Sequence, residues 1–281
     1  MSGAPEPSRY DAGRAAGYWS GPRFEFGDEL AAVLSLGEPR HVNQAYDAWE
    51  TGLLLDALAE AGVPLAGAVA VDVGAGVGRV AVRVAPLVGK LVAGDLAAGM
   101  LGRLRRNAAR AGVPNALPVR FRSDRLPLRD GAASLVLCLG LLEHLPPESR
   151  RATLREAARV LRPGGLLALV LNNEESRFLR DPGDNPHRVG SQRENGYYCA
   201  VVGDRAVLAE AAADFRATVL GANLHYSLHR HASRLLEDDA RRDPRLAPFF
   251  ERAAAWDRVT RPQGPLARAA ADHHLHLLVR R

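Results

Sequence analysis

The sequence predicts a doubly wound α/β protein, in which helices cover both faces of a mostly parallel sheet, and three observations favour this class. The apolar run 69–73 ends in a glycine-rich turn, after which the pattern becomes helical. A second apolar run, 90–95, ends in an acid. The run 133–139 is strongly apolar, as in parallel strands buried on both faces. The 281 residues contain no obvious linker, which favours one large domain over two small ones.

Residues 1–43 are predicted to form an N-terminal extension to a main domain at 44–281. Tyr18, Trp19, Phe24 and Phe26 cluster here, although aromatic residues make up only 6% of the chain. Two interpretations stay open. The cluster either covers apolar surface beside the core or forms a lid over a substrate, in which case Tyr18 and Trp19 contact that substrate.

Glycines 74, 76 and 78 remove every Cβ from the turn after the first strand, so a ligand can lie against its backbone. Such turns serve several kinds of ligand. The dinucleotide-binding fingerprint requires a glycine at the position of Arg79. The phosphate loop of nucleotide hydrolases ends in Lys followed by Ser or Thr, which Arg79 and Val80 do not supply. Neither pattern fits.

Two strands of this region end in an aspartate. Asp72 follows a strand of Val and Ala, and an isolated buried carboxylate is costly, so we expect it to face a cationic ligand. Asp95 ends the next strand, where nucleotide-binding α/β units hold a ribose diol. The ligand should therefore carry a positive group and a ribose, and S-adenosylmethionine has both.

The run Asp72-Val73-Gly74-Ala75-Gly76-Val77-Gly78 resembles the first motif, D/E-x-G-x-G-x-G, of the class I S-adenosylmethionine-dependent methyltransferases. The run 161–165 resembles the family's L-x-P-G-G motif, and the likeness covers roughly 66–172. It implies a Rossmann-like seven-stranded sheet of order 3-2-1-4-5-7-6 with an antiparallel last strand. Helical or irregular insertions are expected at about 173–200 and 232–268. It also implies S-adenosylmethionine as cofactor and methyl transfer to an oxygen or nitrogen of the acceptor. We expect this acceptor to be a small molecule such as a specialised metabolite, because the insertions and the aromatic N-terminal segment could enclose one and no nucleic-acid module is visible.

The resemblance further implies which residues contact the cofactor. An acid after the third strand accepts a hydrogen bond from the adenine amino group in this family, and Asp124 matches it. The alternative for Asp124 is a turn or cap residue, but its register with two other acid-tipped strands favours binding. The expected cofactor contacts are Asp72, Gly74, Gly76, Gly78, Asp95, Leu96, Met100, Ser123, Asp124, Leu139 and Gly140.

His144 lies just after the strand 133–139, at the edge where open α/β sheets build their sites. It is the first candidate for a general base, because imidazole accepts protons near neutral pH. Alternatively, the Glu143-His144 pair only fixes the turn. Some relatives hold a divalent ion here with Glu-x-x-Glu-His, but Gly140 replaces the first glutamate. We therefore expect no metal at this tip.

The remaining segments give weaker predictions. His187, Tyr197 and Tyr198 are candidate acceptor contacts in the irregular insertion, against the alternative of a surface loop. Strands are expected over 215–228 and 272–281. In the latter, His274 and His276 share a face that His273 does not, and we expect them to be exposed rather than metal-binding.

Composition limits the partners and the compartment. The net charge is +5, but the arginines are scattered, so nucleic acid is an unlikely partner. Cys138 and Cys199 are too few and too far apart for a disulfide framework, and no apolar run reaches membrane-spanning length, which favours the cytoplasm. The insertion at 232–268 could form a homodimer contact. RNA or protein methylation, and a non-methylating cofactor-binding scaffold, are the alternative functions.

Overall fold

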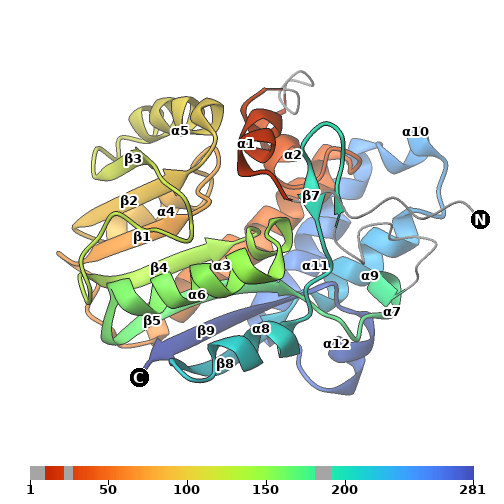
Figure 1. Cartoon of the computed structure of the whole chain (residues 1–281). Helices are drawn as coiled ribbons and strands as arrows, with labels where there is room; N and C mark the ends of the chain where they lie inside the picture. Colours follow the sequence, from red (N-terminus) through yellow and green to blue (C-terminus); the bar gives the residue numbers. More distant parts are fainter. Residues whose placement is uncertain (1–9, 22–27, 181–190) are drawn as a thin grey trace, which may run out of the picture.

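The computed structural model describes residues 10–21, 28–180 and 191–281, and its centre is a seven-stranded sheet of order β3-β2-β1-β4-β5-β9-β8 (Figure 1). The first five strands are parallel, whereas β9 runs antiparallel to both of its neighbours. This confirms the sheet order that the resemblance implied. The strands are β1 (Val69–Val73), β2 (Lys90–Asp95), β3 (Ala116–Arg120), β4 (Ala133–Leu139), β5 (Leu161–Asn172), β8 (Phe215–Ala222) and β9 (His273–Arg280), with a small hairpin of β6 (Ser191–Gln192) and β7 (Tyr198–Cys199) outside the sheet.

Helices cover both faces of the sheet, and each face has its own apolar core. Trp49 and Leu53 of α3 pack on one face with Phe250 of α11. Leu154 of α6 and Val207 of α8 pack on the other. The helices are α1 (Ala12–Ser20), α2 (Glu29–Val33), α3 (Arg40–Glu60), α4 (Ala81–Val84), α5 (Ala98–Arg110), α6 (Pro147–Val160), α7 (Arg177–Arg180), α8 (Asp204–Ala211), α9 (Leu224–Ser233), α10 (Asp238–Arg241), α11 (Ala247–Thr260) and α12 (Pro265–Ala270).

The strand predicted over 215–228 is wrong beyond Ala222, because helix α9 begins at Leu224. The carboxylate of Asp257, on α11, accepts hydrogen bonds from the backbone N–H groups of His225 and Tyr226 at 2.9 and 2.8 Å. A distant residue therefore satisfies the first turn of α9, and the local pattern of the strand does not reveal it.

The expectation that His274 and His276 are exposed is also wrong, since their exposed fractions are 6% and 0%. Strand β9 lies between β5 and β8, and α8 covers the face to which both rings point. Cys138 and Cys199 are free thiols. In the described part of the chain, no helix combines the length and apolar character needed to cross a membrane.

Candidate cofactor and acceptor site

A cavity of about 380 Å³ opens at the carboxyl ends of β1, β2 and β4. Helix α1, the segment 33–50 and the start of α9 complete its wall. Most of the predicted cofactor contacts line it. These are Asp72, Gly74, Gly76, Asp95, Leu96, Met100, Ser123, Asp124, Leu139 and Gly140.

The turn after β1 has left-handed φ values of 78°, 55° and 85° at Gly74, Gly76 and Gly78, which glycine adopts without strain. The amides of Gly74 and Ala75 donate to the carbonyl oxygen of Gly94, at 2.9 and 2.8 Å. Gly78 does not line the cavity. A Cβ there would lie 2.8 Å from Cγ of Leu104, so this glycine serves close packing of the turn on α5.

Asp72 is a buried and poorly compensated charge of the site. Its residue is 4% exposed and lines the cavity, and no hydrogen-bond donor of the described residues contacts its carboxylate. Burial raises the pKa of Asp72 to about 7, although the charge of Arg79 opposes the shift. Arg79 itself binds Asp47 at 2.7 Å and Glu50, both on α3. The carboxylate therefore lacks a counter-ion of its own.

Asp95 is held rigidly beside the same turn. Its Oδ2 accepts a hydrogen bond from the amide of Gly76 at 3.0 Å, and its Oδ1 accepts one from the amide of Ala97 at 2.8 Å. Each carboxylate oxygen accepts more than one hydrogen bond, so both oxygens can still receive ribose hydroxyls.

After β3, the carboxylate of Asp124 was expected to accept a hydrogen bond from adenine, but it already has a partner in the protein. Asp124 lines the cavity, but Arg122 binds both of its oxygens, at 2.9 and 2.6 Å. Sequence reasoning missed Phe121, which also lines the cavity. A Cβ on Gly94 would lie 1.8 Å from its ring, so this glycine makes room for an aromatic wall.

Aromatic side chains from three separate segments meet above the tip of β4. The ring of Trp19 lies 5.0 Å from that of His144, and the ring of Tyr197 lies 5.0 Å from Tyr18 and 5.6 Å from His144. Trp19 also packs against the cofactor side of the cavity, with Val77, Ala97 and Met100. Helix α1 and the β6–β7 hairpin therefore contribute to the same wall of the cavity.

Tyr198 contributes its backbone as well as its ring. Its carbonyl oxygen lies 2.8 Å from Nδ1 of His144, which makes this nitrogen the donor and leaves Nε2 as the basic nitrogen of a neutral ring. Trp19, His144 and Tyr198 line the cavity, whereas Tyr18 and Tyr197 pack behind that wall. His187 lies outside the described residues.

The deeper half of the cavity contains titratable groups that sequence reasoning did not assign. Glu143 lines it, and burial raises the pKa of this carboxyl to about 7. Tyr46 stands between the rings of Tyr226 and His273, at 5.6 and 5.3 Å. The signal for Glu143 was a glutamate in the turn that follows the apolar strand 133–139. Tyr46, Tyr226 and His273 lie in segments in which the sequence shows no motif.

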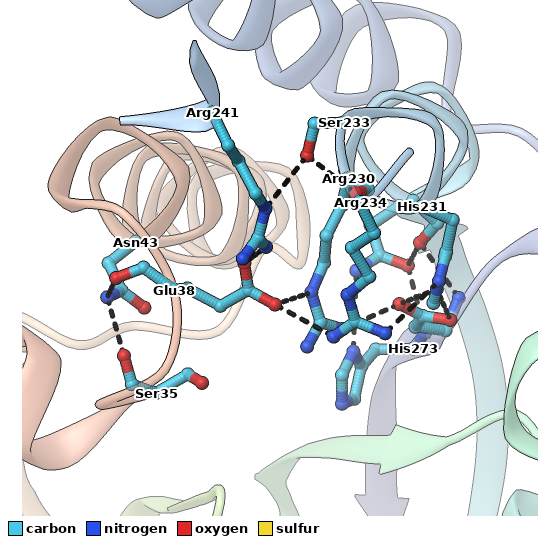
Figure 2. A network of polar contacts seen from close by, with 12 residues as sticks. Ser35, Glu38, Asn43, Arg230, His231, Ser233, Arg234, Arg241 and His273 are labelled. Carbon is cyan, nitrogen blue, oxygen red and sulfur yellow. Dashed lines mark hydrogen bonds and ion pairs between the residues drawn. The ribbon is translucent and has the colours of Figure 1, made fainter. Parts of the chain in front are cut away.

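A network of ion pairs and hydrogen bonds borders this half of the cavity (Figure 2), and its members Glu38 and Arg230 line the cavity. Glu38 accepts hydrogen bonds from Arg230 at 2.9 Å, from Arg234 at 2.8 Å and from Arg241. Arg230 also donates to Asp272 at 2.9 Å. Among the described residues, every arginine that lines the cavity is ion-paired: Arg79, Arg122 and Arg230.

Comparison of the sequence with known proteins agrees with this geometry. The family model described as a methyltransferase domain matches residues 70–165. A ubiquinone biosynthesis O-methyltransferase of Xanthomonas euvesicatoria is 34% identical over 115 residues, which are 41% of this chain and 47% of the relative. An uncharacterised methyltransferase of Mycobacterium bovis is 32% identical over 130 residues, 46% of this chain and 50% of the relative. The chain thus spans about half the length of these curated relatives.

Solved structures share the fold over most of the chain. A geranyl diphosphate C-methyltransferase from Streptomyces coelicolor, in complex with Mg²⁺, geranyl diphosphate and S-adenosyl-L-homocysteine, has a TM-score of 0.59 at 16% identity. The alignment covers 99% of this chain and 100% of that chain. The YcgJ protein from Bacillus subtilis has a TM-score of 0.55 at 18% identity, over 82% of this chain and 98% of that chain. These likenesses concern the fold.

Proposed function

We infer that this chain is a class I S-adenosylmethionine-dependent methyltransferase and that it transfers a methyl group to an oxygen or nitrogen of a small-molecule acceptor; the methyltransferase-domain match and the curated relatives support this proposal. The observation that carries the proposal is the carboxylate of Asp72, which has no counter-ion of its own beside a glycine turn. The α-ammonium group of the cofactor supplies the missing charge. The same cavity continues past this carboxylate to Glu143, which leaves an adjoining place for an acceptor.

The residues of the cofactor half fit S-adenosylmethionine in charge and shape. When bound, this cofactor supplies a methyl group bonded to a positively charged sulfur. The neutral thioether that remains after transfer is a good leaving group and needs no proton. Asp72 would bind the ammonium group and Asp95 the ribose hydroxyls. Phe121 and Met100 offer apolar surface to the adenine. Alignment of the acceptor and exclusion of water then carry most of the rate acceleration.

Two side chains at the tip of β4 are candidates for the proton acceptor. His144 presents Nε2 of a ring held by the carbonyl of Tyr198. Glu143 lies deeper, and its pKa of about 7 allows it to accept a proton near neutral pH. We assign proton removal to Glu143 and positioning of the acceptor to His144, because the aromatic contacts of His144 suit a wall.

The charges around the cavity narrow the acceptor class. Each arginine that lines the cavity in the described part of the chain already binds a carboxylate, and Glu143 adds an acid. Such a site favours a neutral or cationic acceptor over a phosphate or diphosphate ester. A phenol or an amine meets this condition. The free thiols of Cys138 and Cys199 support a reducing compartment such as the cytoplasm.

The proposal is tested in two stages with the full chain. Calorimetry should detect binding of S-adenosylhomocysteine to the wild type and binding at least about tenfold weaker to Asp72→Asn. S-adenosylmethionine with a labelled methyl group is then incubated with panels of phenols, amines, phosphate esters, RNA and protein. Label in a phenol or amine supports the proposal, and label in RNA or protein favours the alternative acceptors. Binding without transfer to any panel indicates a non-methylating scaffold.

A further inference from the structure

Three potential metal ligands meet away from the cofactor cavity, between β9 and the start of α8. Nδ1 of His274 lies 2.8 Å from Oδ2 of Asp204, and Nε2 of His276 lies 3.8 Å from the same oxygen. One ligand atom from each of the three residues falls within 4.8 Å of the others. Around a tetrahedral zinc ion with bonds of about 2.0–2.2 Å, ligand atoms stand about 3.3 Å apart, and the two measured distances bracket this value.

The fold creates this cluster from distant parts of the sequence. His274 and His276 point to the same face of β9 because side chains alternate along a strand. Asp204 is the first residue of α8, which packs over that face through Val207. The cluster thus contains two imidazoles and one carboxylate, a set that suits zinc and other divalent transition metals.

The buried ring of His276 is a second, independent observation that points to a ligand at this place. Its exposed fraction is 0%, and neither ring nitrogen has a hydrogen-bond partner in the described part of the chain. Its neighbours in the sheet are Leu169 and Val219, whose side chains contain no polar atoms. A buried polar group without a partner costs about 1–3 kcal/mol, and a bound cation would remove that cost.

We propose that Asp204, His274 and His276 form a binding site for a divalent transition-metal ion of the zinc type. Asp204 keeps 15% of its side chain exposed, so one side of the site is open to solvent and a water molecule can take the fourth position. The ion would join the start of α8 to β9. The segment just before α8 contains Tyr198, whose carbonyl oxygen accepts a hydrogen bond from His144. A bound ion would therefore also stabilise the wall of the cavity that Tyr198 and His144 form. This proposal does not depend on the methyltransferase assignment.

Zinc binding tests the proposal directly. The full chain is prepared without a histidine tag, stripped with a chelator and titrated with Zn²⁺ in a calorimeter. We expect one equivalent to bind tightly, and Asp204→Asn and His276→Gln each to weaken binding at least tenfold. His225→Gln is the matched control, because His225 likewise pairs with a carboxylate, that of Asp257 at 2.7 Å, but lies outside the cluster of Asp204, His274 and His276. This control should bind zinc as the wild type does.

Cobalt provides a second readout that needs no variant to fold. Co²⁺ added to the stripped wild type should produce the intense visible absorption of a four-coordinate site, and one equivalent of Zn²⁺ should abolish it. Far-UV circular dichroism shows whether the variants are folded. If Asp204→Asn or His276→Gln does not fold, His274→Gln is used as the ligand variant in its place. Absence of tight zinc binding to the wild type, or equal binding by the folded ligand variants and the His225→Gln control, would overturn the proposal.

Discussion

If Asp72 binds the ammonium group of the cofactor, as proposed, cofactor binding should depend on pH. Because its pKa is about 7 before the ligand arrives, a growing fraction of the protein carries a neutral carboxyl as the pH falls below 7. The affinity for S-adenosylhomocysteine should therefore decrease as the pH is lowered from 7.5 to 5.5, approaching about tenfold per pH unit at the acid end. Calorimetry across this range measures the slope. Asp72→Asn should give a flat profile, and a flat wild-type profile would remove Asp72 from ammonium binding.

The same residue should cost stability in the ligand-free chain. The folded-state pKa of Asp72 lies above its unfolded value, so folding favours the protonated form of this carboxyl. The fold is therefore unaffected by Asp72 ionisation below about pH 4 and loses stability as the pH rises through 7 and the buried carboxyl ionises. Asn cannot ionise. We expect Asp72→Asn to raise the free energy of unfolding at pH 8 by on the order of 2 kcal/mol. Denaturant unfolding without ligand measures this, and a midpoint below that of the wild type would contradict it.

The pH profile of turnover distinguishes Glu143 from His144. If Glu143 removes the proton, kcat/KM should rise with an apparent pKa of about 7, and Glu143→Gln should lower kcat by about 10²–10⁴-fold with little change in cofactor affinity. His144→Gln should mainly raise the KM of the acceptor, as expected of a wall. The reverse result, a large loss of kcat in His144→Gln alone, would make His144 the base.

At the level of elements, the contact between α1 and α5 can be tested at one glycine. A Cβ on Gly99 would lie 2.2 Å from the carbonyl oxygen of Ser20, so Gly99→Ala should displace α1 and weaken cofactor binding several-fold. The matched control is Gly102→Ala on the same helix, where a Cβ meets nothing closer than 4.0 Å. Alanine is the better helix former by up to about 1 kcal/mol. Hence the control should bind normally and melt higher, and equal binding by both variants would show that α1 does not cover the site.

How far the sequence predicts an element depends on where its stabilising partners lie. The strands and glycine turn of 69–139 follow from local apolar runs, and the structure has them there. Helix α9 was predicted as strand, because Asp257 caps it from another helix. Helix α3 begins at Arg40, inside the segment predicted as the N-terminal extension, and its first turn packs against the 232–268 insertion through the rings of His41 and Phe250. Such long-range contacts leave no local pattern.

Across the whole molecule, the Glu38 network should make the fold sensitive to acid. Burial alone would raise the pKa of Glu38, but Arg230 and its neighbours outweigh this and lower it. Burial of Asp272 is likewise outweighed by His231 and Arg230, and its pKa falls to about 2. These carboxylates stabilise the fold above their unfolded pKa values, and this contribution is lost as the pH falls from about 5 to 2.

We therefore expect the melting temperature to drop over this acid range, and to drop less steeply in Glu38→Gln, which should already be less stable at pH 7. Breaking one partner of such a buried network typically costs about 3–5 kcal/mol. Scanning calorimetry from pH 7 to 3 measures both effects. Glu60→Gln is the control, because its single salt bridge with Arg261 is largely exposed. Identical curves for all three proteins would exclude the network as the acid-sensitive part.

The whole site was only half predictable. The cofactor half comes from consecutive motifs at strand ends, and all of its predicted residues but Gly78 line one cavity. The half of the cavity that we propose for the acceptor combines Glu38, Tyr46, Arg230 and His273, which approach one another only after α9 and α11 pack on α3. No spacing in the sequence encodes that convergence. The burial of His274 and His276 was missed for the same reason, since α8 covers them.

The Glu38 network both lines the acceptor cavity and clasps the C-terminal insertion to the N-terminal segment. Attempts to re-engineer substrate preference at Glu38 or Arg230 will thus select first for folded clones and only afterwards for new chemistry. Glu143 belongs to no such network of ion pairs among the described residues, so its replacement should lower turnover and leave the fold intact.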